Sequence, residues 1–223
     1  MDKMNSKPDI SELRRHINEL PLDSDDHSLR EQAIAQLPKE IQEGARKLVE
    51  SRKNANVLLD AMIVDLGRAS VELKKNYEDQ FWRRTAIRTL AATVDGIIFT
   101  LKELTHISGE FAGFKFNDSE IEFLRERKFD PGQGKPRLPG FKDNIKGTFE
   151  LFAKAHNFSF STDFGTEGFS ALRDTYELRH GLMHPKSFET FCVTTEQTKR
   201  AGIAIKWLYD ELNRLIDACS SQL

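Results

Sequence analysis

Apolar residues recur at helical spacing along most of this 223-residue chain. Between residues 39 and 77 they return every three, four or seven positions, which predicts one or two long helices. The strongest signal covers residues 81–107, where the apolar positions make one broad face of a helix. The basic side chains of this segment fall largely outside that face: Arg83, Arg84, Arg88 and Lys102.

The rest of the chain is also predicted to form helices separated by loops. Residues 130–140 hold three prolines and three glycines and are predicted to be a loop. No segment shows strand alternation bounded by hairpin turns, and residues 187–194 are the one place where a short strand is possible. The further helices are predicted over residues 119–128, 141–156, 166–183 and from Thr194 to about residue 216.

This pattern predicts an all-α protein, an up-and-down helical bundle with an N-terminal helical extension. We expect the extension to occupy residues 1–56 and the bundle to occupy residues 57–218. The first 27 or so residues are polar and include an acidic run at residues 23–26, so we expect them to be weakly ordered.

The composition is that of a soluble globular protein. The chain is 39% hydrophobic and 30% charged, and no apolar run approaches the length of a membrane span. The N-terminus lacks the apolar core of a signal peptide and the two cysteines are isolated, so we expect a reduced, cytoplasmic compartment. Because the formal net charge is −2, any contact with RNA must come from a local basic patch.

We expect neither a metal site nor a cofactor. The chain has no glycine loop that could cradle a nucleotide, no HExxH motif and no GxSxG motif, which argues against kinases, zinc proteases and serine hydrolases. Four histidines share no metal-ligand spacing and receive no predicted role: His16, His27, His106 and His156.

Chemically useful side chains gather at the end of the helix predicted over residues 166–183. Arg179, His180 and His184 supply a fixed cation and two imidazoles. Pro185 disfavours the helical conformation in the residue before it, so the helix should end near Met183 and free His184 to approach Arg179 or a partner chain. RNA cleavage without a metal requires a proton carrier and a cation beside the phosphate, and this segment supplies both.

These residues resemble the signature of the HEPN family of α-helical domains, an arginine and a histidine separated by four to six positions, the first of which is usually a polar residue. Arg179 and His184 fit that spacing, and His180 stands where the family most often has asparagine. Residues 81–104 also resemble the family's first long helix with its basic start, with Asp95 where related chains often carry an acidic residue. The resemblance covers the predicted bundle.

The resemblance implies a metal-independent endoribonuclease of the kind found among toxins, in antiviral defence against phage and in RNA processing. The ribose 2′-oxygen would attack the adjacent phosphate and leave a cyclic phosphate. His184 would act as acid or base, Arg179 would stabilise charge on the phosphorane, and His180 would be a supporting polar group. Active members usually pair two motifs, which implies a homodimer, with an antitoxin or regulatory protein as a further candidate partner.

Several alternatives stay open at this point. Arg173 and His180 also match the signature, but the helix stop and the trailing proline belong to the register of Arg179 and His184. Because some family members have lost catalysis, the module could instead bind RNA, nucleotide or a protein partner. The long helical stretch at residues 39–77 could equally mark a structural interaction protein.

The region of residues 125–146 is locally basic. It is either a solvated loop or a rim that guides RNA, because lysine and arginine side chains neutralise phosphate charge. The candidate RNA-binding residues are Arg125, Arg127, Lys128, Lys135 and Arg137.

Overall fold

The computed structural model describes residues 27–111, 114–126 and 139–221. Within these ranges the regular elements are helices and no strand occurs, so the predicted all-α class is confirmed for this part of the chain. In chain order they are α2 (His27–Ala35), α3 (Lys39–Lys75), α4 (Gln80–Phe111), α5 (Asp118–Leu124), α6 (Phe141–Ala155), α7 (Glu167–Met183), α8 (Phe188–Phe191) and α9 (Thr195–Ser220).

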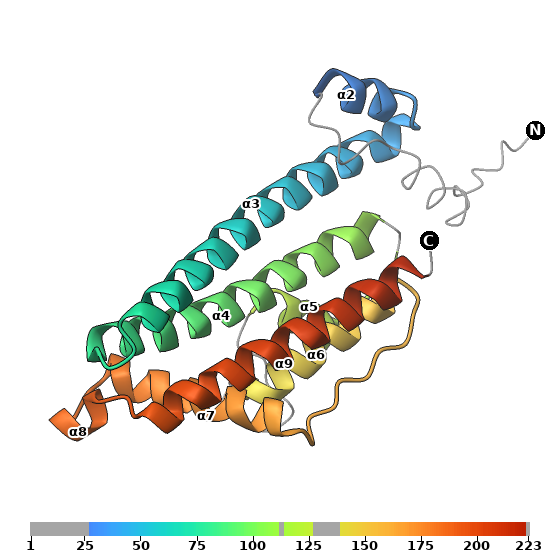
Figure 1. The fold of residues 1–223 in the computed structure, drawn as a ribbon. Coiled ribbons are helices and arrows are strands. Elements are labelled where there is room, and N and C mark those ends of the chain that lie inside the picture. The colour runs from blue at the N-terminus through green and yellow to red at the C-terminus, as the bar shows by residue number, and fades with distance from the viewer. Residues whose placement is uncertain (1–26, 112–113, 127–138, 222–223) are drawn as a thin grey trace, which may run out of the picture.

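Helix α4 lies at the centre of the fold and contacts α3, α5, α6, α7 and α9 (Figure 1). It occupies this place because its apolar positions recur at helical spacing and make one broad face. The contacting helices supply the other half of a single main core, whose members include Ile87, Leu90 and Val94 of α4, Phe149 of α6, Leu172 of α7 and Leu208 of α9.

Helix α3 is continuous and runs beside α4 along most of its length. The two helices approach closely where α4 has a glycine: a Cβ atom added to Gly96 would lie 2.1 Å from Cε of Met62. The predicted division between extension and bundle, at residues 56 and 57, lies inside this helix. α3 therefore joins the N-terminal part of the chain to the bundle without a linker.

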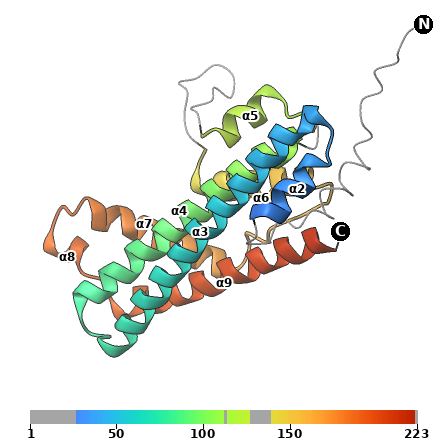
Figure 2. The same cartoon turned by 90° about the horizontal axis from the view of Figure 1, so that it is seen from above.

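A second, smaller core lies at the N-terminal end of α3. Ile34 of α2 and Ala45 of α3 are buried there against Phe111, near the end of α4. Helix α2, which contributes to this smaller core, and helix α8 occupy opposite ends of the molecule in both views (Figures 1 and 2). The segment expected to be weakly ordered lies outside the described residues, except for its last position, His27, with which α2 begins.

The predicted starts of α7 and α9 are confirmed by their caps. The Thr166 hydroxyl accepts from the backbone N–H of Phe169 at 3.3 Å, and Thr194 forms a capping box with Gln197. The possible strand at residues 187–194 is wrong, because this segment contains the short helix α8. None of the described helices has the length and continuous apolarity needed to cross a lipid bilayer.

Candidate active site at the end of helix α7

Helix α7 ends where the sequence predicted, at Met183. His184 is the cap residue, with φ −131° and ψ 62°, and its backbone N–H donates to the carbonyl of His180 at 3.2 Å. This conformation lies outside the helical region because the ring of Pro185 excludes it from the preceding residue. His184 therefore begins the departing chain while remaining one turn from His180.

The two histidines pack against one another at the surface. Their ring centres lie 5.4 Å apart and the ring planes meet at 63°, an edge-to-face arrangement. Both His180 and His184 are exposed. A proton can therefore reach either imidazole from solvent or from a bound substrate.

Arg179 is turned toward α4, where it meets the carboxylate of Asp95. Its Nη2 atom lies 3.9 Å from Oδ2 of Asp95, and its side chain is 33% exposed. The guanidinium carbon lies 5.8 Å from the centre of the Tyr176 ring. Asp174, which could have been the partner of Arg179, pairs instead with Arg200 at 2.6 Å. The long distance to Asp95 leaves most of the guanidinium N–H donors available to a ligand.

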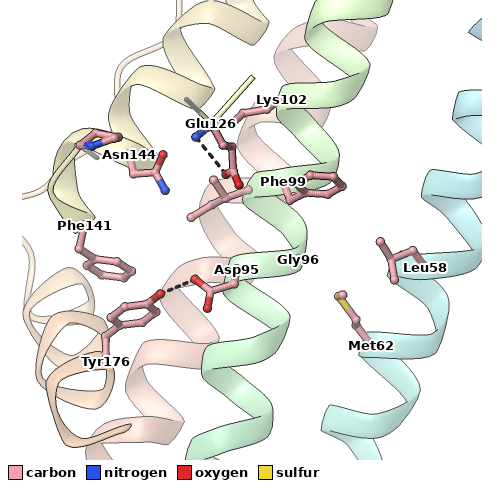
Figure 3. A pocket seen from close by; sticks show the side chains of 12 residues that line it. Leu58, Met62, Asp95, Gly96, Phe99, Lys102, Glu126, Phe141, Asn144 and Tyr176 are labelled. Carbon is pink, nitrogen blue, oxygen red and sulfur yellow. Dashed lines mark hydrogen bonds and ion pairs between the residues drawn. The ribbon is translucent and has the colours of Figure 1, made fainter. Parts of the chain in front are cut away.

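Tyr176 connects this arginine to α4. Its hydroxyl donates to Oδ1 of Asp95 (Figure 3). The same carboxylate faces Arg179. Burial raises the pKa of Tyr176, and the hydrogen bond to Asp95 raises it further, so the hydroxyl remains a donor at neutral pH. Tyr176 was not among the residues predicted for the site, although it lies three residues before Arg179 and so on the same side of the helix.

The chain that leaves α7 is held to α4 by two arginines. Arg88 donates from Nη2 to the carbonyl of Leu182 at 2.8 Å, and Arg84 donates from Nη1 to the carbonyl of Phe191 at 3.4 Å. The guanidinium carbon of Arg84 also lies 4.0 Å from the centre of the Phe191 ring. Because His184 lies between these two attachment points, α4 helps to set its position.

Arg83 is buried, so its predicted place outside the apolar face is wrong. Its side chain donates to the carbonyls of Tyr77 at 2.7 Å and Val193 at 3.0 Å. It lies four residues before Ile87 and seven before Leu90, the spacing of one helical face, so the pattern itself indicates burial. The basic start of α4 thus anchors the segment after α7.

Lys102 is also buried, with 2% of its surface exposed, so its predicted place outside the apolar face is wrong as well. Its Nζ atom lies 3.2 Å from Oε1 of Glu126 and 4.3 Å from the centre of the Phe123 ring. Burial lowers the pKa of Lys102, and the charge of Glu126 opposes that shift. Glu126 has φ 53°, a left-handed conformation usual for glycine after a helix, and its carboxylate faces Lys102 (Figure 3).

Replacing Lys102 by methionine is expected to raise the free energy of unfolding at pH 7 by about 1 kcal/mol, because the variant buries no charge and Glu126 stays partly solvated. The folded state lowers the pKa of Lys102, so deprotonation favours folding. The advantage of the variant should therefore shrink as the pH rises toward 10.5, the usual pKa of lysine. Urea unfolding at several pH values measures both effects.

Lys47→Met is the matched control, because Lys47 pairs with Glu43 on the exposed side of α3. It should change the free energy of unfolding by less than about 0.5 kcal/mol at any of these pH values. A Lys102→Met variant that is less stable than wild type at pH 7 would show that the buried ion pair stabilises the fold.

A cleft of about 560 Å³ adjoins Arg179 through two shared neighbours, Asp95 and Tyr176. His180 and His184 are not among its lining residues. Its walls come from α3, α4, α6 and α7, and Glu126 and Pro139 also line it (Figure 3). The residues that line it are Leu58, Met62, Asp95, Gly96, Ile98, Phe99, Lys102, Glu126, Pro139, Phe141, Asn144 and Tyr176.

The predicted RNA-guiding rim is described at one position. Arg125 is exposed at the end of α5 and donates from Nε to Nε2 of His106 at 3.2 Å. The other candidates lie outside the described residues: Arg127, Lys128, Lys135 and Arg137.

Across the described ranges, no group of three or more His, Cys, Asp or Glu side chains could hold a metal ion. Comparison of the chain with protein-family models, with curated proteins and with solved structures found no match. The geometry around α7 is therefore the basis for assigning a function.

Proposed function

We propose that this protein is a metal-independent endoribonuclease of the HEPN type. The observation that carries the proposal is the arrangement at the end of α7, where a loosely paired arginine and an exposed histidine of the last turns lie beside a second exposed histidine at the cap position. Arg179 and His180 are consecutive, so their side chains leave the helix about 100° apart rather than on opposite faces. A phosphate bound at this corner can contact Arg179 and His180, and His184 lies next to it because its ring packs on that of His180.

Each group has a definite role in the proposed reaction. His184 transfers a proton to or from the reacting oxygens while the ribose 2′-oxygen attacks the phosphate and the 5′-oxygen leaves. Arg179 stabilises the negative charge that develops on the phosphorane. His180 packs on the His184 ring and restricts its orientation. Asp95 and Tyr176 position Arg179.

The active form in this proposal is a homodimer in which the second copy faces the end of α7. Two apolar side chains next to the histidines favour such a contact: Met183 and Phe188 are 50% and 76% exposed. Toxin, phage-defence and RNA-processing roles are all compatible with this chemistry. An antitoxin or another regulatory protein would act by covering the same end of the molecule.

Replacing Arg179 by alanine is expected to lower the rate of RNA cleavage by about 10²-fold or more, because the charge on the phosphorane loses its main partner. The assay incubates purified protein with mixed RNA in the presence of a chelator. Arg173→Ala is the matched control, because Arg173 lies on the exposed side of the same helix and belongs to the rival register. Equal loss in both variants, or loss in Arg173→Ala alone, would contradict the assignment.

A second candidate function is a binding module without catalysis. The observation that favours it is the cleft beside Arg179, which shares Asp95 and Tyr176 with the arginine but excludes both histidines. Binding of RNA or a nucleotide without cleavage by wild-type protein would favour this candidate over the enzyme.

A further inference from the structure

The cleft in Figure 3 has two facing walls of different character. On one side the rings of Phe141 and Tyr176 stack with their centres 4.1 Å apart and their planes 24° from parallel. On the other side Leu58 and Met62 project from α3. The volume of about 560 Å³ falls in the range of small-molecule sites. An aromatic wall opposite an aliphatic wall suits a flat ring.

The charged groups of the cleft are already neutralised by the protein. Asp95 is paired with Arg179 at 3.9 Å, and Glu126 is paired with Lys102 at 3.2 Å. A ligand therefore needs no net charge to be accommodated. Each carboxylate retains lone pairs for further hydrogen bonds, because an ionised carboxylate accepts at about four sites.

The side chain of Asn144 adds an unused acceptor at the same place. Its Oδ1 atom is buried and has no hydrogen-bond partner, although Asn144 lines the cleft. An unpaired buried acceptor costs free energy that a ligand N–H group would recover. With Asp95 and Glu126, this makes the polar edge of the cleft rich in acceptors, so it favours a ligand that presents N–H donors.

We propose that this cleft binds a neutral heteroaromatic ring that carries an amino group. In the proposed ribonuclease it receives an amino-bearing base of the RNA next to the phosphate at Arg179, and this second part rests on the proposed function. The cleft and the phosphate position at Arg179 are adjacent, because Asp95 and Tyr176 line the cleft and also face Arg179. Adenine is a suitable ring, since an asparagine amide can pair with its amino edge.

Titration calorimetry with adenosine and purine riboside tests the proposal, because the two differ only in the amino group, which purine riboside lacks. The full chain carrying His184→Ala is used so that no catalytic turnover interferes. Adenosine is expected to bind about tenfold more tightly than purine riboside, the effect of one hydrogen bond. Equal affinities, or no saturable binding of adenosine, would overturn the proposal.

Two variants test the location of this binding. Leu58 lines the cleft and is partly exposed on α3, so Leu58→Trp should place an indole group in the cleft. This variant is expected to abolish adenosine binding. Asn144→Leu removes the amide and should weaken binding about tenfold. Their matched controls are Val57→Trp and Asn213→Leu, both at exposed positions outside the cleft lining. Cleft variants that fold normally and bind adenosine like wild type would overturn the assignment.

A 2′-O-methyl oligonucleotide containing adenine, which lacks the attacking hydroxyl, distinguishes RNA from a free ligand. Competition with adenosine for the cleft would support the part that concerns RNA. Adenosine binding without such competition would overturn that part and assign the cleft to a free heterocycle. Since these measurements involve no cleavage, failure of the ribonuclease proposal and failure of the cleft proposal give different results.

Discussion

Replacing His184 by alanine is expected to lower the rate of RNA cleavage by about 10²–10⁴-fold, the usual contribution of a positioned proton carrier. The loss should exceed that caused by His180→Ala, because His180 supports the neighbouring ring and does not itself transfer the proton. Initial rates on a labelled RNA in the presence of a chelator provide the measurement. The exposure of His184 means that the substitution should leave the fold unchanged.

His27→Ala is the control for this experiment, because His27 is exposed on α2, at the opposite end of the molecule from α8 (Figure 1). It should cleave RNA at the wild-type rate. Cleavage at the wild-type rate by His184→Ala would show that the proton carrier lies elsewhere, and the proposed site would then be wrong.

Replacing Arg83 by leucine is expected to lower the free energy of unfolding by about 3 kcal/mol. The substitution leaves the carbonyl of Tyr77 without the donor 2.7 Å away and removes one of the donors to the carbonyl of Val193. It also removes the ion pair with Glu78 at 2.7 Å. Arg83→Lys should recover only part of the loss, because an ammonium group cannot reproduce the fork of donors.

Urea unfolding followed by circular dichroism measures this change in stability. Arg68→Leu is the matched control: Arg68 is exposed on α3, and its replacement should change the free energy of unfolding by less than about 0.5 kcal/mol. If Arg83→Leu were as stable as the control, the arginines of α4 would not be what holds the segment after α7.

Local features of the fold could be predicted because they depend on a few neighbouring residues. Thr166 and Thr194 are the N-caps of α7 and α9, as predicted. Such a cap can be predicted because the hydroxyl needs only the backbone N–H group three residues later. The end of α7 at Met183 follows in the same way from Pro185. The short helix α8 was not predicted, although Ser187 and Thr190 form a capping box at its start.

Contacts between helices could be predicted only in part. The burial of Arg83 follows from its spacing to Ile87. Its partner Val193 is 110 residues away in the sequence, and a local pattern cannot predict which distant residue a side chain will contact. The hydrogen bond between Tyr176 and Asp95 likewise depends on how α7 packs against α4.

Asp95 was singled out in the sequence only through the family resemblance, and in the structure it faces Arg179. The sequence pattern did not require a cation nearby, because the Asp95 side chain is 44% exposed. Its pairing with Arg179 depends on how α7 packs against α4.

In the proposed mechanism Arg179 and His184 serve one centre that cleaves RNA by attack of the 2′-oxygen. Analysis of the ends of RNA incubated with wild-type protein in the presence of a chelator tests this mechanism. The expected products carry 2′,3′-cyclic phosphate and 5′-hydroxyl ends that are absent with Arg179→Ala and with His184→Ala. Intact RNA, or fragments that end in 3′-hydroxyl and 5′-phosphate groups, would contradict this mechanism.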